Sequence, residues 1–403
     1  MSSRRSVAHN PTVVGVAAAS FFSDLGHEMA TAVLPGFLTS LGAPAVALGV
    51  IEGVSDAALS ASKLAGGAVA DRPGVDRPLL AGGAYLTTGV AYGSFALAGA
   101  WPFIALAKGV AWAARGFRSP ARDSILAGAV EPEYLGRAFG FERAGDSLGA
   151  IVGPLVAATL IGALGYRRLF VVSFLPAVLA AAAIVLLTRD VGRMGTALRG
   201  AGSGMREVVR GSPRFRTLLY GVGLYGLGNF SATLLILRAT ALLHDAGRSP
   251  TSAATIAVLL YAGHNAANAG AAYPAGALAD RVGRRPVLVA GIVLFAAACF
   301  AFAFGSSEVL VLAVLFVVVG ASTGMVETAQ GSHAAELLAE HLRGRGFGLL
   351  GLVEGVGDLV SSVTVGVLWT ITDPMWGFLV AGSLASLGAC VLLRRQPREA
   401  SGT

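Results

Sequence analysis

The chain has 403 residues, of which 55% are hydrophobic and only 13% are charged, and its mean hydropathy is +0.70. Soluble globular proteins carry roughly 25% charged residues, so this composition excludes an ordinary water-soluble domain. The net charge is +7, and a positive net charge is typical of proteins that bind nucleic acid. The arginines, however, fall in alternate loops between apolar segments, which indicates membrane topology instead and predicts no nucleic-acid partner.

Apolar segments long enough to cross a bilayer, about 20 residues each, recur along the whole chain. We expect twelve transmembrane helices and hence an all-α membrane protein. In chain order they span 12–38, 44–70, 78–99, 101–123, 136–163, 168–188, 217–243, 252–279, 286–305, 307–330, 345–370 and 373–393. The N-terminal sequence combines arginines with an apolar run, as signal peptides do, but the run continues to Leu41. We therefore expect it to be retained as the first helix.

The distribution of arginine predicts the orientation in the membrane. Most arginines lie in one set of alternate loops, whereas Arg167, Arg168 and Arg248 are the main cations of the other set. By the positive-inside rule the first set is cytoplasmic, which places both termini in the cytoplasm, as an even number of helices requires. The dominance of Ala, Gly and Arg suggests a high-GC bacterium, so we predict a multi-pass protein of a bacterial inner membrane.

An internal repeat organises the chain. The sequence GGAVADRPGVDRPLLAGG matches AGALADRVGRRPVLVAGI with Asp71 over Asp280, an offset of 280 minus 71, or 209. GRAFGFERAGDSLGA, from Gly136, matches GRGFGLLGLVEGVGD, from Gly344, with an offset of 208 (344 minus 136). A register kept over this distance indicates duplication. We predict two pseudo-symmetric six-helix bundles, residues 1–188 and 217–403, joined by an Arg- and Gly-rich cytoplasmic linker, 189–216.

Two motifs carry a family resemblance. The sequence GALADRVGRRP, Gly276–Pro286, resembles the loop signature of the major facilitator superfamily, and GAVADRPGVDRP, Gly67–Pro78, resembles its first-half copy. The resemblance implies this family's two-bundle fold and transport by alternating access. We expect a monomer. Charge pairs of such a loop can pin helix ends and break when the bundles rock apart. The proposed gating residues are Gly67, Asp71, Arg72, Gly276, Asp280, Arg281, Gly283, Arg284 and Arg285. The positive-inside rule alone also explains these charges, without any role in gating.

GDSLGAIVGPLVA in the fifth helix resembles the glycine-proline motif of the family's antiporters. Gly145, Gly149 and Gly153 recur every four residues and form a smooth face that another helix can approach, while Pro154 removes a backbone donor and permits a bend. The resemblance implies antiport. Tight packing without contact to a solute explains the same residues equally well.

Ionisable residues lie within lipid-length segments, where each costs roughly 2.5–3.5 kcal/mol on an insertion scale. In the first helix, Asp24, His27 and Glu28 share one face. We therefore expect the charged faces to line a polar passage between the bundles. Carboxylates whose proton affinity changes with access make proton coupling feasible. The candidates for that role are Asp24, Glu28, Glu52, Asp56, Glu142 and Asp146, and Glu354 is the repeat counterpart of Asp146.

The fourth helix presents a basic stripe of Lys108, Arg115, Arg118 and Arg122. The stripe either neutralises the facing acids or binds an anionic solute. For Lys108 and Arg115, which lie deeper, the two interpretations are equal. The candidates for lining the cavity are His27, Lys108, Arg115, Tyr225, Asn229, Arg238, His264, Glu354 and Asp358.

We predict a secondary active transporter, with proton-coupled antiport or efflux of a small molecule as the main hypothesis. The alternatives are proton-coupled uptake of an organic anion, and transport of a metal ion or metal chelate by His27 with nearby carboxylates. No phosphate-binding glycine-lysine loop is present, and we expect no enzymatic activity, no cofactor and no resident metal. Cys299 and Cys390 are expected to be packing residues. The expected partners are the lipid bilayer, protons and the solute.

Overall fold

The computed structural model describes residues 9–70, 74–131, 135–189, 213–338 and 343–394, and their regular structure is helical. The first half contains α1 (Pro11–Ser40), α2 (Ala45–Ala70), α3 (Arg77–Gly93), the 3-10 helix η2 (Ser94–Leu97), α4 (Trp101–Gly128), α5 (Leu135–Val172) and α6 (Phe174–Leu187). The second half contains α8 (Pro213–Gly226), α9 (Ala232–Asp245), α10 (Pro250–Val282), α11 (Arg284–Phe304), α12 (Val309–Leu337), α13 (Arg343–Ile371) and α14 (Pro374–Leu393).

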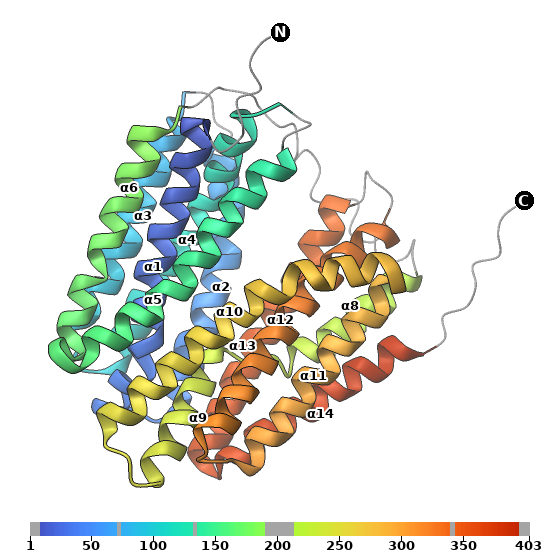
Figure 1. The fold of residues 1–403 in the computed structure, drawn as a ribbon. Coiled ribbons are helices and arrows are strands. Elements are labelled where there is room, and N and C mark those ends of the chain that lie inside the picture. Colours follow the sequence, from blue (N-terminus) through green and yellow to red (C-terminus); the bar gives the residue numbers. More distant parts are fainter. Residues whose placement is uncertain (1–8, 71–73, 132–134, 190–212, 339–342, 395–403) are drawn as a thin grey trace, which may run out of the picture.

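These helices form the twelve predicted spans. The label α5 joins two of them, because Gly165 has a φ of 68° and breaks the helix between the predicted spans 136–163 and 168–188. Figure 1 shows the chain turning back there, and α6 packs on α1 and α3. Judged by length and hydropathy alone, the described residues hold six segments that can cross a membrane. The remaining spans include α3, which has only 17 residues, and α4, which carries the basic stripe.

The predicted seventh helix, 217–243, is wrong in one respect, because the structure interrupts it. Helix α8 ends at Gly226 and α9 begins at Ala232. The interruption contains Gly228, where a Cβ would collide with the backbone oxygen of Ala381. The Ser231 side chain then caps α9 by accepting a hydrogen bond from the Thr233 N–H at 3.4 Å. Glycine and asparagine favour such a break, and a serine cap restarts the helix.

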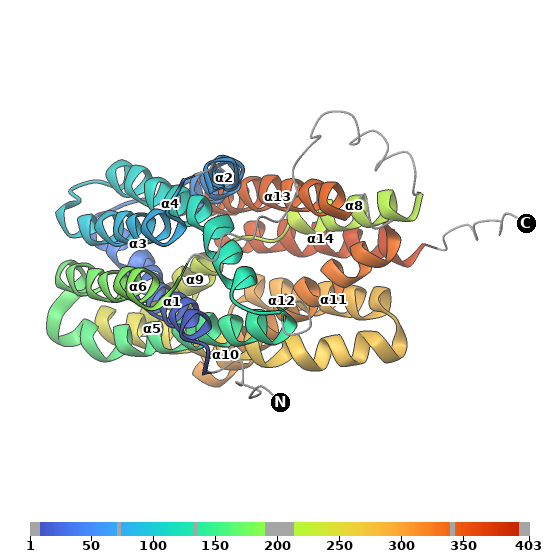
Figure 2. The same cartoon turned by 90° about the horizontal axis from the view of Figure 1, so that it is seen from above.

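The two halves use matching neighbours. In the first half α2 packs on α4 and α3 packs on α6; in the second, α10 packs on α12 and α11 packs on α14. Between the halves, α2 lies against α13 and α5 lies against α10, as Figure 2 shows from above. This correspondence follows the order that the sequence repeat predicts.

The glycines of the fifth span face α1. A Cβ at Gly145 would lie 2.7 Å from the Ala17 carbonyl oxygen, and one at Gly153 would lie 2.7 Å from the Leu25 carbonyl oxygen. A Cβ at Gly149 would collide with the Phe21 carbonyl oxygen. The predicted close helix approach is therefore present, because these positions have no room for any larger residue.

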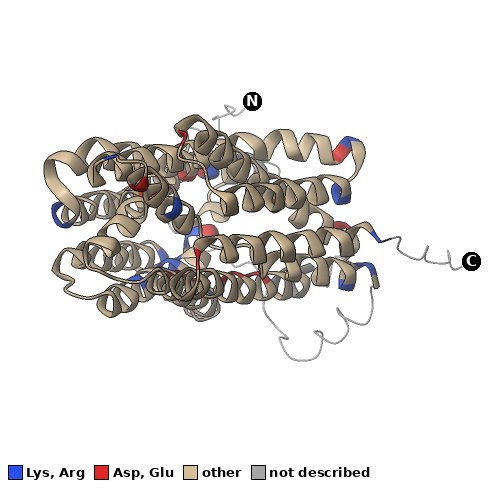
Figure 3. Cartoon of the chain, turned by 90° about the horizontal axis from the view of Figure 1, so that it is seen from below, with Lys and Arg blue, Asp and Glu red and all other residues tan. Residues whose placement is uncertain are grey.

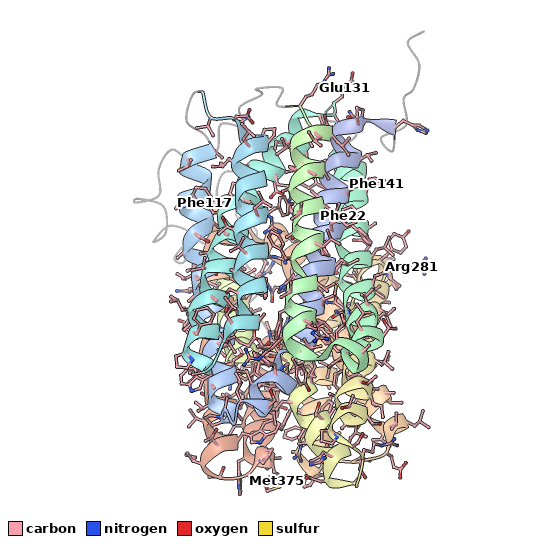
Figure 4. All side chains as sticks on the ribbon, turned by 90° about the vertical axis from the view of Figure 1, so that its left-hand side faces the viewer. Phe22, Phe117, Glu131, Phe141, Arg281 and Met375 are labelled. Carbon is pink, nitrogen blue, oxygen red and sulfur yellow. The ribbon has the colours of Figure 1, made fainter. Side chains whose placement is uncertain are left out.

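The halves touch near one end and diverge towards the other. Near the closed end the Val46 N–H donates to Thr370 Oγ1 at 3.0 Å, and Gly49 packs directly on the Ser362 backbone. Midway along, Asn265 Nδ2 donates to the Ala150 carbonyl oxygen at 2.8 Å. Beyond these contacts the ribbons of the halves spread apart in Figure 1. Figure 4 marks the two ends of the molecule by Glu131, on the spread side, and Met375, on the closed side.

Candidate functional site

A cavity of about 240 Å³ lies between the halves and is lined by both. The first half contributes residues of α1, α2 and α4, and the second contributes the interrupted seventh span together with α10, α11, α12 and α13. The lining residues are His27, Glu28, Thr31, Glu52, Asp56, Trp112, Asn229, Phe230, Ser231, Ala232, Thr233, Leu235, Tyr261, His264, Phe295, Val319, Thr323 and Asp358. Binding sites of membrane transporters typically lie at such interfaces beside a discontinuous helix.

The cavity wall is acidic. Glu28 on α1 accepts a hydrogen bond from the Tyr261 hydroxyl on α10 at 2.9 Å. Glu52 on α2 accepts one from the Thr233 hydroxyl on α9 at 3.1 Å. Both bonds cross from one half to the other, so these acids join the halves while facing the cavity.

The other two lining acids, Asp56 and Asp358, also come from opposite halves. Asp358 on α13 accepts a hydrogen bond from Asn229 Nδ2 at 3.0 Å. No cation of the described residues lies within 4.0 Å of either carboxylate. The acidic charge at these two positions is therefore not neutralised by an ion pair.

The basic stripe of α4 lies behind the wall and is paired. Lys108 is fully buried, with its Nζ 2.5 Å from Glu52 Oε1. Arg115 Nη1 lies 2.8 Å from Asp24 Oδ1, and the buried Asp24 packs on α5 beside Gly149, near enough to Asp146 for the two charges to interact. The lining residues include no lysine or arginine. Neutralisation therefore accounts for Lys108 and Arg115 in this structure.

The outer members of the stripe are also held by first-half partners. Arg122 Nη1 lies 2.9 Å from Glu142 Oε1, and Ser20 donates to the same Glu142 oxygen at 2.7 Å. Arg118 donates to Ser23 Oγ at 2.8 Å and stacks over the Tyr85 ring at 4.1 Å. Glu142 thus lies in a buried ion pair and does not line the cavity.

His27 belongs to a hydrogen-bonded chain of aromatic residues. Its Nδ1 lies 2.7 Å from the Tyr92 hydroxyl, which accepts a hydrogen bond from Trp112 Nε1 at 2.8 Å. Because the indole N–H can only donate, the Tyr92 proton is free to point at Nδ1. This assignment places the proton of a neutral imidazole on Nε2, which lies 3.7 Å from Glu28 Oε1. His27 therefore presents a donor to the cavity acid.

Of the remaining residues predicted to line the cavity, some do so and others lie behind its wall or away from it. His264 lines the cavity and stacks on Tyr261 with ring centroids 5.8 Å apart. Tyr225 lies behind the wall and donates to Asn229 Oδ1 at 3.2 Å. Glu354 accepts a hydrogen bond from Gln330 without lining the cavity. Arg238 lies away from the cavity, where it donates to the Phe302 carbonyl oxygen at 3.4 Å.

The loop motif of the second half ties helix ends within that half. Gly283 has a φ of 95° and separates α10 from α11. Arg284 Nη1 lies 3.2 Å from Glu336 Oε2 at the end of α12, and Arg285 donates to the backbone oxygens of Leu392 and Arg394 after α14. The motif therefore pins α11 to α12 and α14, and its predicted gating between halves stays a prediction.

Other motif positions contribute little to this pinning. Asp280 and Arg281 are exposed, and Gly276 packs near Thr328. Asp71 and Arg72 lie outside the described residues, and Gly67 lies in α2. Figure 3 shows the charged residues gathered between the helices and at helix ends.

The sequence alone did not single out several residues that line the cavity or lie directly behind its wall. Tyr92 and Trp112 are aromatic residues in apolar helices, so nothing distinguished them from packing residues. Ser231 and Thr233 follow the helix-breaking sequence GLGN, which was a usable signal of an interrupted span. Among the described residues, no group of three or more His, Cys, Asp and Glu side chains is placed to hold a metal ion.

Comparison with known proteins identifies the family. The model of the Major Facilitator Superfamily matches residues 16–238 and 218–403. An uncharacterized MFS-type transporter of Methanocaldococcus jannaschii is 28% identical over 379 residues, which cover 93% of this chain and 92% of that protein. An uncharacterized protein of Mycobacterium bovis is 30% identical over 371 residues, or 90% of this chain and 87% of that protein.

Among solved structures, a mutant form of the nucleoside transporter NupG has the same fold, with a TM-score of 0.81 at 13% identity, and the match covers 95% of this chain and 99% of that one. The fold, the cavity between two halves and the family match agree. The protein is a multi-pass membrane transporter without enzymatic function, and it belongs to the Major Facilitator Superfamily.

Proposed function

We propose that this transporter exchanges protons for a small solute by alternating access, exporting the solute across a bacterial inner membrane. The observation that carries the proposal is the buried Asp24–Arg115 ion pair directly behind the cavity wall, with the Asp146 carboxyl beside it. These groups belong to α1, α4 and α5, so a change in their charge acts on the packing of three helices at once.

Asp24 is paired with Arg115, whereas the nearby Asp146 has, among the described residues, only the exposed Arg143 guanidinium, 4.0 Å from its Oδ2, as an ion-pair partner. The weakly paired Asp146 carboxylate can bind a proton, and that proton removes the repulsion between Asp146 and Asp24. Binding or loss of that proton changes how strongly α1 and α5 are held to α4. Proton binding is thereby linked to the arrangement of the helices that line the cavity.

The spread end of the molecule is the proposed cytoplasmic end. The positive-inside prediction puts both termini on that side, and the halves are closed at the opposite end by contacts such as Val46–Thr370. In this orientation the structure is inward-facing. Export requires a second, outward-facing arrangement in which the spread ends of α5 and α10 come together.

Uptake of an organic anion has less support, because the lining residues include no lysine or arginine and the deep cations are paired with acids. Transport of a metal ion has less support as well, because no metal-holding cluster occurs in the described parts of the chain. The helix-5 motif favours antiport only through its resemblance to antiporters, since its glycines face α1.

The experiment measures the distance between nitroxide labels at Phe141 and Leu278, which are exposed near the spread ends of α5 and α10. Cys299 and Cys390 are first replaced by alanine to give a cysteine-free background. In nanodiscs we expect a long and a short distance population, with a ratio that changes between pH 5 and pH 8.

The double variant Asp24→Asn/Asp146→Asn should weaken the response of the distance populations to pH, because it removes the proposed proton site and leaves the other cavity acids in place. The control Glu308→Gln changes an exposed acid at the start of α12 and should leave the response intact. A single distance population at every pH contradicts alternating access, and an unchanged pH response in the double variant contradicts the proposed proton site.

A further inference from the structure

We propose that the transported solute is a compact organic cation, such as a protonated amine, held between Asp56 of α2 and Asp358 of α13. The proposal rests on the function proposed above and specifies the chemistry of its cavity. It assigns the solute contact to one acid from each half of the transporter.

The packing of α2 on α13 brings the two acids together. Leu359, the neighbour of Asp358, packs against Gly53, and Gly355 lies beside Ser60, where a Cβ would be 3.1 Å from the serine Oγ. Asp56 and Asp358 both line the cavity and lie close enough for their charges to interact. The cavity therefore carries two neighbouring carboxylates that belong to opposite halves.

The charge around this pair is unbalanced. Lys108 lies near Asp56, but its ammonium is bound to Glu52 at 2.5 Å and its side chain does not reach the cavity. Asp358 accepts a hydrogen bond from the neutral amide of Asn229. The other acids near it, Glu327 and Glu354, have the cations Arg143 and Lys63 in their own surroundings. Two carboxylates that share a site without a cation of their own are stabilised either by a proton or by a counter-charge, and a cation from solution supplies that counter-charge.

The rest of the wall favours an organic cation over a metal ion. Trp112, Phe230, Tyr261 and Phe295 present aromatic rings to the cavity. Aromatic faces attract ammonium groups and pack against hydrocarbon, whereas hard metal ions require several oxygen ligands. The volume of about 240 Å³ lies below the usual range of drug-sized pockets, roughly 300–1,000 Å³, which favours a compact solute.

The internal repeat supplies an independent argument. With the offsets of 209 and 208 residues, Asp56 corresponds to Asn265 and Asp358 corresponds to Ala150. At that equivalent contact between α10 and α5, the Asn265 amide donates to the Ala150 carbonyl oxygen at 2.8 Å. An uncharged pair is therefore sufficient to join the halves at this position. The acids of the α2–α13 contact have no such structural requirement, which points to a ligand.

Exchange follows from the chemistry of the pair. A carboxylate that carries a proton no longer attracts an ammonium, so protons and the cation compete for Asp56 and Asp358. Competition at one site converts inward proton movement into outward movement of the cation. Bridging by the cation also removes the repulsion between α2 and α13, which favours closure around the solute.

The test uses three aromatic probes of similar size: 2-phenylethylammonium, 2-phenylethanol and phenylacetate. Binding to the purified full-length protein in nanodiscs is measured by calorimetry at pH 7.5, without a pH gradient. We expect the ammonium probe to bind at least tenfold more tightly than the alcohol and the carboxylate. Asp56→Asn and Asp358→Asn should each weaken its binding at least tenfold, whereas Glu308→Gln should leave it unchanged.

The wild-type comparison does not depend on how the variants fold. If the ammonium binds no better than the alcohol, or if none of the probes binds, the assignment of a cationic solute is overturned. If the ammonium binds but both Asn variants keep its affinity, the assignment of the two acids is overturned. Selective binding without any pH response of the nitroxide distances refutes proton coupling and leaves the cation site standing, so the two proposals fail separately.

Discussion

Replacing Lys108 tests whether the basic stripe of α4 serves to neutralise buried acids. The Lys108 ammonium and the Glu52 carboxylate are 2.5 Å apart, with side-chain exposures of 0% and 5%. At an effective dielectric constant of about 20, this separation gives an attraction of about 6–7 kcal/mol, most of which offsets the cost of removing both charges from water. Removal of one partner from a buried pair typically costs about 3–5 kcal/mol.

We therefore expect Lys108→Met and Glu52→Gln each to lower the free energy of unfolding by about 3–5 kcal/mol. Glu52→Gln should be the more severe change, because it leaves a fully buried ammonium unpaired, whereas Glu52 borders the cavity and can be partly hydrated there. The double variant Lys108→Met/Glu52→Gln removes both charges and should lie within about 2 kcal/mol of the wild type.

The free energy of unfolding is measured by titration with sodium dodecyl sulfate in mixed micelles, followed by tryptophan fluorescence. Trp112 is a local reporter, since its ring centroid lies 5.6 Å from the Lys108 nitrogen. Lys63→Met is the matched control, because Lys63 is exposed on α2. If Lys108→Met costs no more than Lys63→Met, or if the double variant is as unstable as the sum of the single ones, the neutralising role is refuted.

Two further predictions concern the closed end and the loop motif. Gly49→Val should disfavour the conformation of this structure, the proposed inward-facing state, by about 1–3 kcal/mol, because the added side chain meets the Ser362 backbone. The nitroxide pair should then show roughly a fivefold or greater gain of the short distance, and Gly83→Val, where space is open, should show none. Glu336 lies beyond the membrane-length part of α12; partial burial raises its pKa, but hydrogen bonds from Arg284 and His333 and the charge of Arg284 lower that pKa below the ordinary value. A lowered folded-state pKa stabilises the protein above the unfolded-state value, about 4.3, and this stabilisation is lost as pH falls through the folded-state value. The melting temperature of Glu336→Gln should therefore be lower than that of the wild type at pH 7 and should approach it near pH 3. The free energies of unfolding at pH 7 should differ by at most about 1 kcal/mol, because the Glu336 side chain is half exposed. A constant difference across this range contradicts the ion-pair role.

The spans and their order could be predicted from sequence because bilayer thickness imposes segment length and because the repeat imposes equivalence. The interruption of the seventh span was not predicted, because the local signal GLGN is weak: glycine and asparagine also occur in continuous membrane helices. What supports the break is the backbone contact between Gly228 and Ala381, which are 153 residues apart (381 minus 228). A contact at that distance along the chain cannot be read from the local sequence.

Contacts between distant segments also limited what the sequence could predict of the candidate site. Helical periodicity put His27, Glu28, Glu52 and Asp56 among the candidate site residues, and the structure has all four in the lining of the cavity. It could not decide which acids Lys108 and Arg115 neutralise, because that depends on the rotation of α4 relative to α1 and α2. Arg238 shows the opposite outcome, since its depth in the apolar segment suggested a cavity residue and the structure pairs it with carbonyl oxygens of α11.

The charge on Glu28 and Glu52 affects how the two halves are held together, because each of these acids has partners in both halves. Glu52 is neutralised by Lys108 of its own half and accepts a hydrogen bond from Thr233 of the other. Glu28 faces His27 within its half and accepts from Tyr261 across the cavity. A hydrogen bond to a carboxylate is roughly twice as strong as one between neutral groups, so the contact between the halves weakens whenever the acid is protonated. In the proposed proton-coupled mechanism, protonation of these first-half acids weakens the contacts between the halves, which is the physical link that coupling of protons to alternating access requires.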